Sequence, residues 1–240
     1  MKNLTFTICL TLAVLLGSVG TSWGADYDKG YSAYHAAVES GDFATALREW
    51  RHLAEQGDAD AQYYLGLMYM VGQGVPRDLK TGFKWYTLSA EQGNANAQRD
   101  LGFMYWKGNQ GVKENFKTAV KWSTLAAEQG HDIAQMDLGQ HYKHGTGVPR
   151  DYKTAVKWYT LAVEQGNARA QYYLGLMYRD GFGVLQDNVY ALMWLNIAIS
   201  SGFDFPTKRR YLLKAKMTPA DISAAQELAQ ECVRKKYKGC

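Results

Sequence analysis

Five tryptophans recur along the chain at an almost constant interval. The steps between them are 35, 37, 36 and 36 residues, at Trp50, Trp85, Trp122, Trp158 and Trp194. Four Leu-Gly pairs and four tyrosines keep the same interval, beginning at Leu65-Gly66 and Tyr69. A constant period of roughly 20–50 residues is typical of solenoids and propellers. Because the repeats of a solenoid contact only their neighbours, its function usually resides in an extended surface.

One repeat is represented by residues 59–94, and its first half has the pattern of an amphipathic helix. Ala61, Leu65 and Met68 recur at helical spacing and form one apolar stripe. Gly66 accompanies this stripe and recurs in the other repeats. A glycine by itself weakens a helix, so its recurrence favours a close approach of the partner helix.

The second half of the repeat predicts a turn followed by another helix. Gly72 and Gly74 can adopt positive φ, and Pro76 disfavours a helical conformation before it, so the first helix is expected to end near Gly72. Asp78 is in the right place to cap a second helix. Trp85 lies on that helix, and we expect it and the equivalent Trp122 and Trp158 to be packing residues. Each repeat is therefore predicted to be a helix, a glycine turn and a helix.

The pattern predicts an all-α solenoid over residues 25–203, with about twelve helices in the whole chain and no sheet. Four full repeats, an incomplete repeat before them and a helical cap after them are expected at 59–94, 95–131, 132–167, 168–203, 28–58 and 204–240, respectively. The cap is predicted to hold one helix over residues 208–216 and a last helix from Thr218, its N-cap, to about Lys235. The last helix would cover the apolar face that a solenoid otherwise exposes at its end.

The repeat resembles the Sel-one-like repeat, a relative of the tetratricopeptide repeat. The similarity covers about residues 30–205 and is clearest at Ala134, Leu138-Gly139, Tyr142, Gly145-Thr146-Gly147-Val148, Asp151, Ala155, Trp158, Ala162 and Gly166. It departs at Gly82, where the family's second helix has alanine. The resemblance implies a right-handed superhelix of antiparallel helix pairs. For exported members, it also implies an adaptor or regulator that binds other proteins.

The N-terminus has the pattern of a cleaved secretory signal in residues 1–24. An apolar run without charge follows Lys2, and small residues at Ser22 and Gly24 precede the expected cleavage site. The alternative is a membrane anchor, although the run is short for the roughly 20 residues that a spanning helix needs. We expect a periplasmic or secreted protein with no membrane span after cleavage. Disulfides persist in such compartments, so a bridge between Cys232 and Cys240 is expected.

The charge and the polar residues exclude several classes of function. The formal net charge of +4 is too small to indicate a nucleic-acid-binding protein. No nucleophile motif, zinc-protease motif or phosphate-binding loop is present, so no catalytic residue and no cofactor is expected. His141 and His144 are three residues apart and could share a metal, but His141 occupies a packing position and no third ligand is evident. We therefore expect no metal.

One face of the first helices has the chemistry of an interface. It lies opposite the packing stripe and holds Tyr63, Leu67, Met70, Arg99, Phe103, Trp106, Met136, Gln140, Lys143, Tyr172, Leu176 and Arg179. A solvated helix face would be mostly charged, whereas this one is aromatic, aliphatic and basic and carries no acid. Aromatic residues, methionine and arginine are enriched at interfaces. The alternative is that neighbouring first helices pack together and bury part of this face.

These observations favour a monomeric, exported scaffold or adaptor that binds a protein or peptide in a concave groove, in cell-envelope regulation or assembly. A groove with arginine and lysine among aromatic residues would suit a peptide carrying acids. Two alternatives remain. Some cysteine-rich relatives are linked to β-lactam hydrolysis, but here no repeat contains a cysteine. Binding of glycan or peptidoglycan through the tyrosine-rich surface is the other alternative, and no motif supports it. The basic C-terminal cap is a second possible interface.

Overall fold

The structure is a computed structural model that describes residues 32, 35–36, 39–108, 111–205 and 207–240. The expected signal sequence and most of the helix predicted over residues 28–40 lie outside these residues. The chain divides into two compact units, one up to Ala97 and the other from Gln98 to Cys240. Each unit is described by itself below.

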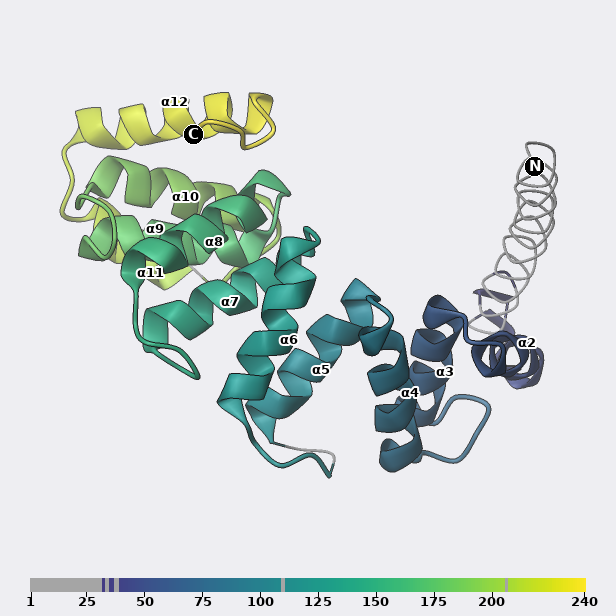
Figure 1. Ribbon diagram of the computed structural model, residues 1–240. Coiled ribbons are helices and arrows are strands. Elements are labelled where there is room, and N and C mark those ends of the chain that lie inside the picture. The colour runs from purple at the N-terminus through teal and green to yellow at the C-terminus, as the bar shows by residue number, and fades with distance from the viewer. Residues whose placement is uncertain (1–31, 33–34, 37–38, 109–110, 206) are drawn as a thin grey trace, which may run out of the picture. The chain divides into compact units, whose positions relative to one another are not determined.

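The described residues form eleven helices and no strand, as predicted for an all-α solenoid (Figure 1). They are α2 (Ala44–Glu55), α3 (Ala59–Val71), α4 (Leu79–Glu91), α5 (Ala95–Lys107), α6 (Phe116–Glu128), α7 (Asp132–His144), α8 (Tyr152–Glu164), α9 (Ala168–Asp180), α10 (Asn188–Ser200), α11 (Thr207–Lys214) and α12 (Pro219–Arg234). Helices adjacent in sequence contact each other as pairs, with α3 on α4, α7 on α8 and α9 on α10. None of the helices in the described part is long and apolar enough to cross a membrane.

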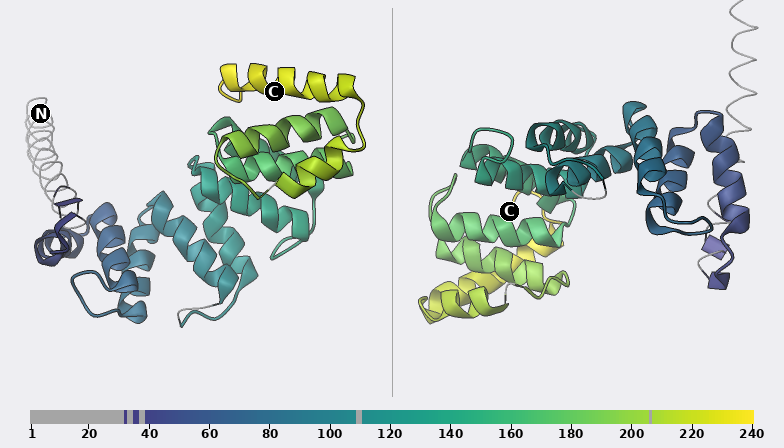
Figure 2. Two further views of the ribbon diagram at one scale, coloured as in Figure 1. Left: turned by 180° about the vertical axis from the view of Figure 1, so that it is seen from behind. Right: turned by 90° about the horizontal axis from the view of Figure 1, so that it is seen from below.

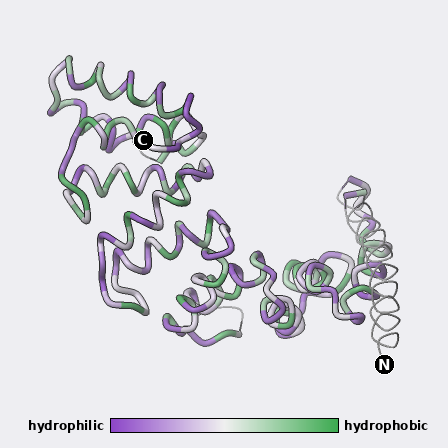
Figure 3. The backbone as a smooth tube through the Cα atoms, turned by 45° about the horizontal axis from the view of Figure 1, so that its top comes forward, coloured by the Kyte–Doolittle hydropathy of each residue, from purple (hydrophilic) through white to green (hydrophobic). Residues whose placement is uncertain are grey.

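Side-chain caps fix where the second helix of each repeat begins. Asp78 Oδ1 accepts hydrogen bonds from the backbone N–H groups of Lys80 at 3.0 Å and Thr81 at 3.1 Å, so the predicted cap is confirmed. Asp151 caps α8 in the same way. Such a cap satisfies donors that the first turn of a helix cannot pair internally. Along the helices, hydrophobic and hydrophilic residues alternate, as expected for helices that bury one face (Figure 3).

The repeated Leu-Gly pairs allow the two helices of a repeat to approach closely. In the third repeat, a Cβ atom added to Gly139 would lie 2.5 Å from the ring of Tyr159, which comes from the partner helix and is fully buried. Gly66 meets the ring of Tyr86 in the same way in the first repeat. The predicted packing role of these glycines is therefore confirmed.

Buried glutamines join the two helices of a repeat through side-chain hydrogen bonds that the sequence did not predict. The bridges are Gln92 to Gln62 at 2.7 Å, Gln129 to Gln98 at 2.8 Å and Gln165 to Gln135 at 2.8 Å. In the last repeat, Ser201 takes the place of the bridging glutamine. Gln171 then has no hydrogen-bond partner for its buried side-chain amide among the described residues. The bridge is thus lost where the solenoid ends.

The C-terminal cap covers the last repeat in the second unit. Helix α12 packs along α10, and α11 also contacts α10 (Figures 1 and 2). Trp194 of α10 and Cys232 of α12 share one core cluster. A disulfide joins Cys232 to Cys240, with 5.5 Å between their Cα atoms, and ties the tail to α12.

The repeated tryptophans are not buried to the same extent. Trp50 and Trp194 are buried, whereas Trp85, Trp122 and Trp158 are half-buried. Each of the half-buried residues lies on the second helix of its repeat, and Trp85 and Trp158 pack against core clusters. Trp194 is better covered because the cap closes over its helix.

The turn of the third repeat offers a direct test of how tightly the repeats stack. Gly147 has a φ of 79°, and an added Cβ atom would lie 2.3 Å from the backbone oxygen of Phe116 at the start of α6. Gly111 has a similar φ of 83°, but no described atom lies within 4 Å of its added Cβ. Both alanine variants suffer the same backbone strain, so their difference isolates the clash. We expect Gly147→Ala to lower the free energy of unfolding by about 1–3 kcal/mol more than Gly111→Ala. Equal losses in urea denaturation would show that the turn does not seat against α6.

Candidate partner-binding pocket

A pocket opens on the first helices of three successive repeats in the second unit. Its volume is about 360 Å³. Helices α5, α7 and α9 supply most of its lining, which consists of Arg99, Gly102, Phe103, Trp106, Ser123, Met136, Asp137, Gln140, His141, His144, Thr146, Arg169 and Tyr173. A volume of this size holds one or two amino-acid side chains and matches the lower range of ligand sites.

Two large aromatic side chains of α5 line the pocket and remain accessible to solvent. Phe103 is 39% exposed and Trp106 is 45% exposed, and their ring centroids lie 5.8 Å apart. The guanidinium of Arg99 lies over the Phe103 ring at 5.5 Å, and the ammonium of Lys107 lies over it at 5.7 Å. Exposed aromatic rings next to cations are typical of protein interfaces.

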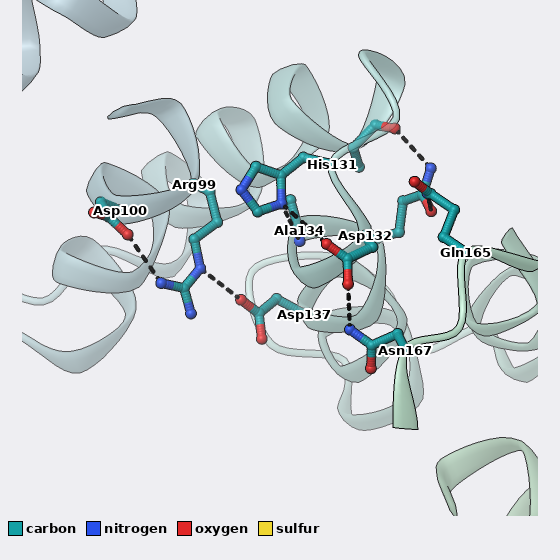
Figure 4. Close-up of polar contacts among 10 residues, drawn as sticks. Arg99, Asp100, His131, Asp132, Ala134, Asp137, Gln165 and Asn167 are labelled. Atoms are coloured by element: carbon teal, nitrogen blue, oxygen red, sulfur yellow. Dashed lines mark hydrogen bonds and ion pairs between the residues drawn. The ribbon is translucent and has the colours of Figure 1, made fainter. Parts of the chain in front are cut away.

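Arg99 lies between two carboxylates in this pocket (Figure 4). Its Nη1 donates to Asp100 on its own helix at 2.9 Å, and its Nε lies 3.6 Å from Asp137 on α7. Burial raises the pKa of Asp137 to about 6, although the nearby Arg99 and Arg169 act to lower it. Asp137 therefore changes its charge near neutral pH, where ordinary carboxyl groups stay ionised.

Two hydrogen-bond donors of the pocket are left without a partner. The guanidinium of Arg169, at the start of α9, makes no hydrogen bond or ion pair with any described residue, and it acts on Asp137 only through its charge. The buried Nε2 of Gln140 also has no partner in the described chain. A buried unpaired donor is costly, and such a group in a native structure requires an explanation.

The two histidines of the pocket do not form a metal site with the residues described. His141 is buried, and its Nδ1 lies 2.8 Å from the backbone oxygen of Thr146, which fits its predicted packing position. His144 is exposed. Burial lowers the pKa of both imidazoles, so they are neutral at pH 7. No cluster of three metal-ligating side chains occurs within the described ranges.

The structure brings together the predicted contact residues of the second and third repeats. Arg99, Phe103, Trp106 and Gln140 line the pocket, and Met136 forms part of its buried wall. The ammonium of Lys143 lies over the ring of Tyr173, a pocket residue, at 5.3 Å. The two repeats thus contribute to one site.

The predicted surface is not exposed at either end of the solenoid. Three of its residues, Met70, Tyr172 and Leu176, are buried and cannot reach a partner in this conformation. Tyr63 and Leu67 are half-buried in the first unit, where Tyr63 stacks on Tyr86. For these positions the alternative of packing within the protein describes the structure better than an open groove does.

The chain's own C-terminal cap covers the fourth repeat. Arg209 of α11 donates to the hydroxyl of Tyr172, and its guanidinium lies over the ring at 5.6 Å. Phe203 and Phe205 also contact the Tyr172 ring, with centroids at 5.5 Å and 5.9 Å. The predicted contact residue Arg179 is half-buried and pairs with Asp180 at 2.7 Å.

Three functional candidates were not predicted from the sequence: Asp137, Arg169 and Tyr173. They lie outside the predicted stripe because the pocket forms where three helices meet, and a single helix face does not show that geometry. One signal was available in the sequence. The place of Asp137 is occupied by Tyr64 in the first repeat and by Tyr173 in the fourth. The second repeat has an acid there as well, Asp100. Acids at a place that is aromatic in the outer repeats mark a departure from the packing pattern.

Comparison with known proteins places these features in a family. The family model described as Sel1 repeat matches residues 59–94, 95–131, 132–167 and 168–203, which are the four predicted repeats. No curated protein matches the chain.

Several solved structures resemble the chain. A Sel1 repeat protein from Oxalobacter formigenes is 38% identical with a TM-score of 0.61, over 67% of this chain and 47% of that one. A protective antigen of uropathogenic Escherichia coli is 27% identical with a TM-score of 0.58, over 88% of this chain and 55% of that one. An immunity protein from Pseudomonas aeruginosa has a TM-score of 0.50 at 17% identity, over 88% and 82% of the two chains, and shares the fold alone. The matched region spans about half the length of the first two proteins.

Proposed function

This chain belongs to the Sel1 repeat family, and from that premise we propose that it is a scaffold that binds a protein partner through the pocket of α5, α7 and α9. One observation carries the proposal: Phe103 and Trp106 are exposed beside a charged pocket, and the packing of the repeat does not require them. The other tryptophans described occupy the repeating position on the second helix, whereas Trp106 lies on a first helix. A few aromatic and arginine side chains commonly provide most of an interface's binding energy.

The proposed partner is a protein of the cell envelope or of the extracellular space. This rests on the signal-like N-terminus and on the paired cysteines of the tail. The similarity to a protective antigen and to an immunity protein supports a role in recognition without identifying what is recognised. We propose no enzymatic reaction, because no nucleophile with an adjacent base is recognised in the pocket.

Photo-crosslinking tests the proposal with whichever partner the envelope extract contains. A photo-reactive amino acid placed at His144, an exposed residue of the pocket, is expected to give a discrete adduct in that extract. The same amino acid at Lys157, an exposed residue of α8 outside the pocket, serves as the matched control. An adduct from position 157 alone, or from neither position, would contradict binding at this pocket.

A further inference from the structure

We propose that the pocket of α5, α7 and α9 recognises an acidic side chain of the partner, held by Arg169 and Gln140, next to an apolar side chain held by Phe103 and Trp106. This inference rests on the proposed function and deepens it, because it states the chemistry of the segment that binds. It follows from the unused donors of the pocket, from its charges and from the way in which the chain covers its own last repeat.

The unused polar groups of the pocket are mainly donors. Arg169 presents a guanidinium with no partner, and Gln140 presents a buried Nε2 with no partner. Both groups lie on the pocket wall together with Asp137, the only acid among the described lining residues. A carboxylate can accept from a guanidinium and from an amide at once, and hydrogen bonds between charged groups are stronger than neutral ones.

The charges of the pocket also favour a negative ligand. Asp137 is already engaged by Arg99, whose other ion pair goes to Asp100. Arg169 then remains as an uncompensated positive charge. A lysine or arginine from a partner would have to compete with Arg99 for Asp137 and would be repelled by Arg169. An acid of the partner meets the free cation.

The end of the solenoid shows what kind of apolar contact this face of a repeat accepts. On α9 the chain covers Tyr172 with two phenylalanine rings and the stacked guanidinium of Arg209. The equivalent places on α5 and α7 are Arg99 and Met136, which line the pocket. Phe103 and Trp106 are exposed beside them. A partner segment that brings an aromatic or large aliphatic side chain next to its acid would cover this part of α5 as the cap covers α9.

The proposal has a pH signature whose sign can be worked out. The charged and titratable groups that act on Asp137 are Arg99 and Asp100 from α5, Tyr159 from α8 and Arg169 from α9. Above pH 6 the Asp137 carboxylate repels a partner's acid, and below pH 6 it is neutral. Protonation of His141 and His144 at lower pH adds positive charge to the same pocket. A partner's acid, with an ordinary pKa near 4, stays ionised over this range. Binding should therefore tighten as the pH falls from 7.5 to 5.5.

Selection from a random library of twelve-residue peptides displayed on phage tests the proposal on the purified exported chain. We expect enriched sequences to pair an Asp or Glu with a neighbouring aromatic or large aliphatic residue. Synthetic copies of the enriched peptides, carrying a fluorescent label, are then measured by anisotropy. For the wild type we expect at least about fivefold tighter binding at pH 5.5 than at pH 7.5, equivalent to about 1 kcal/mol. Arg169→Gln should weaken binding at least about tenfold at both pH values. Lys157→Gln, which removes an exposed base outside the pocket, should change nothing.

The variant Asp137→Asn separates the charge of Asp137 from a purely structural role. With the repelling carboxylate removed, binding at pH 7.5 should approach the wild-type value at pH 5.5, and the remaining pH dependence should be smaller. Enrichment of Lys or Arg in place of acids, or unchanged binding in Arg169→Gln, would overturn the inference while leaving the proposed function intact. Peptides that bind Trp106→Ala as well as the wild type, or no enrichment at all, would count against the pocket itself.

Discussion

Replacing both Phe103 and Trp106 with alanine is expected to remove most of the chain's affinity for its partner. These two rings are the largest exposed aromatic surface of the pocket, and central aromatic residues of an interface often contribute about 2 kcal/mol or more each. We expect Trp106→Ala alone to weaken binding at least about tenfold, and the double variant at least about thirtyfold. Titration calorimetry with the partner identified by crosslinking at position 144 measures both losses.

Leu125 and Leu185 provide the matched control for the double variant. Both are exposed apolar residues of the same unit that do not line the pocket. The variant Leu125→Ala/Leu185→Ala should bind the partner like the wild type, and all variants should keep the helicity of the wild type in circular dichroism. Equal losses of affinity in the two double variants would show that exposed apolar area in general, and not this pocket, binds the partner.

Replacing Trp194 with alanine is expected to cause the largest loss of stability. Its side chain is 3% exposed and belongs to the core cluster that joins α8, α9, α10 and α12. Truncating a buried tryptophan to alanine typically lowers the free energy of unfolding by about 3–5 kcal/mol. Trp158 has the same place one repeat earlier but is half-buried, so Trp158→Ala should cost clearly less. Urea denaturation followed by circular dichroism compares the two variants. A cost for Trp158→Ala as large as that for Trp194→Ala would mean that the cap adds nothing to the burial at this position.

The fold could be predicted from the sequence because each repeat states its own structure several times. The Leu-Gly pairs, glycine turns and caps such as Asp78 are local signals, and four copies in register leave little ambiguity. The helix predicted over residues 208–216 is found at Thr207–Lys214, and the last helix is found at Pro219–Arg234. These small shifts at the ends are usual for helix boundaries.

The candidate site could be predicted only in part, because it depends on contacts between distant segments. The identity of Arg99, Phe103 and Trp106 as an exposed group followed from helical spacing and from the place of Trp106 outside the tryptophan repeat. The burial of Tyr172 could not be predicted in this way, since it results from α11 folding back over α9. The raised pKa of Asp137 likewise depends on burial that its own helix does not reveal.

The burial of the tryptophans shows the same limit. Repetition predicted that Trp85, Trp122 and Trp158 occupy equivalent places, and the structure gives all three the same half-buried state. Repetition could not predict that Trp194 is buried more completely, because the covering helix α12 lies outside the repeat pattern.

Hydrogen–deuterium exchange on the chain alone and in complex with its crosslinked partner tests the central claim most directly. Binding at the pocket predicts slower exchange in peptides that contain Arg99 to Trp106 of α5 and Asp137 to His144 of α7, with α12 unchanged. Slower exchange confined to α11 and the basic residues after Arg234, with α5 and α7 unchanged, would contradict the account and place the interface on the C-terminal cap.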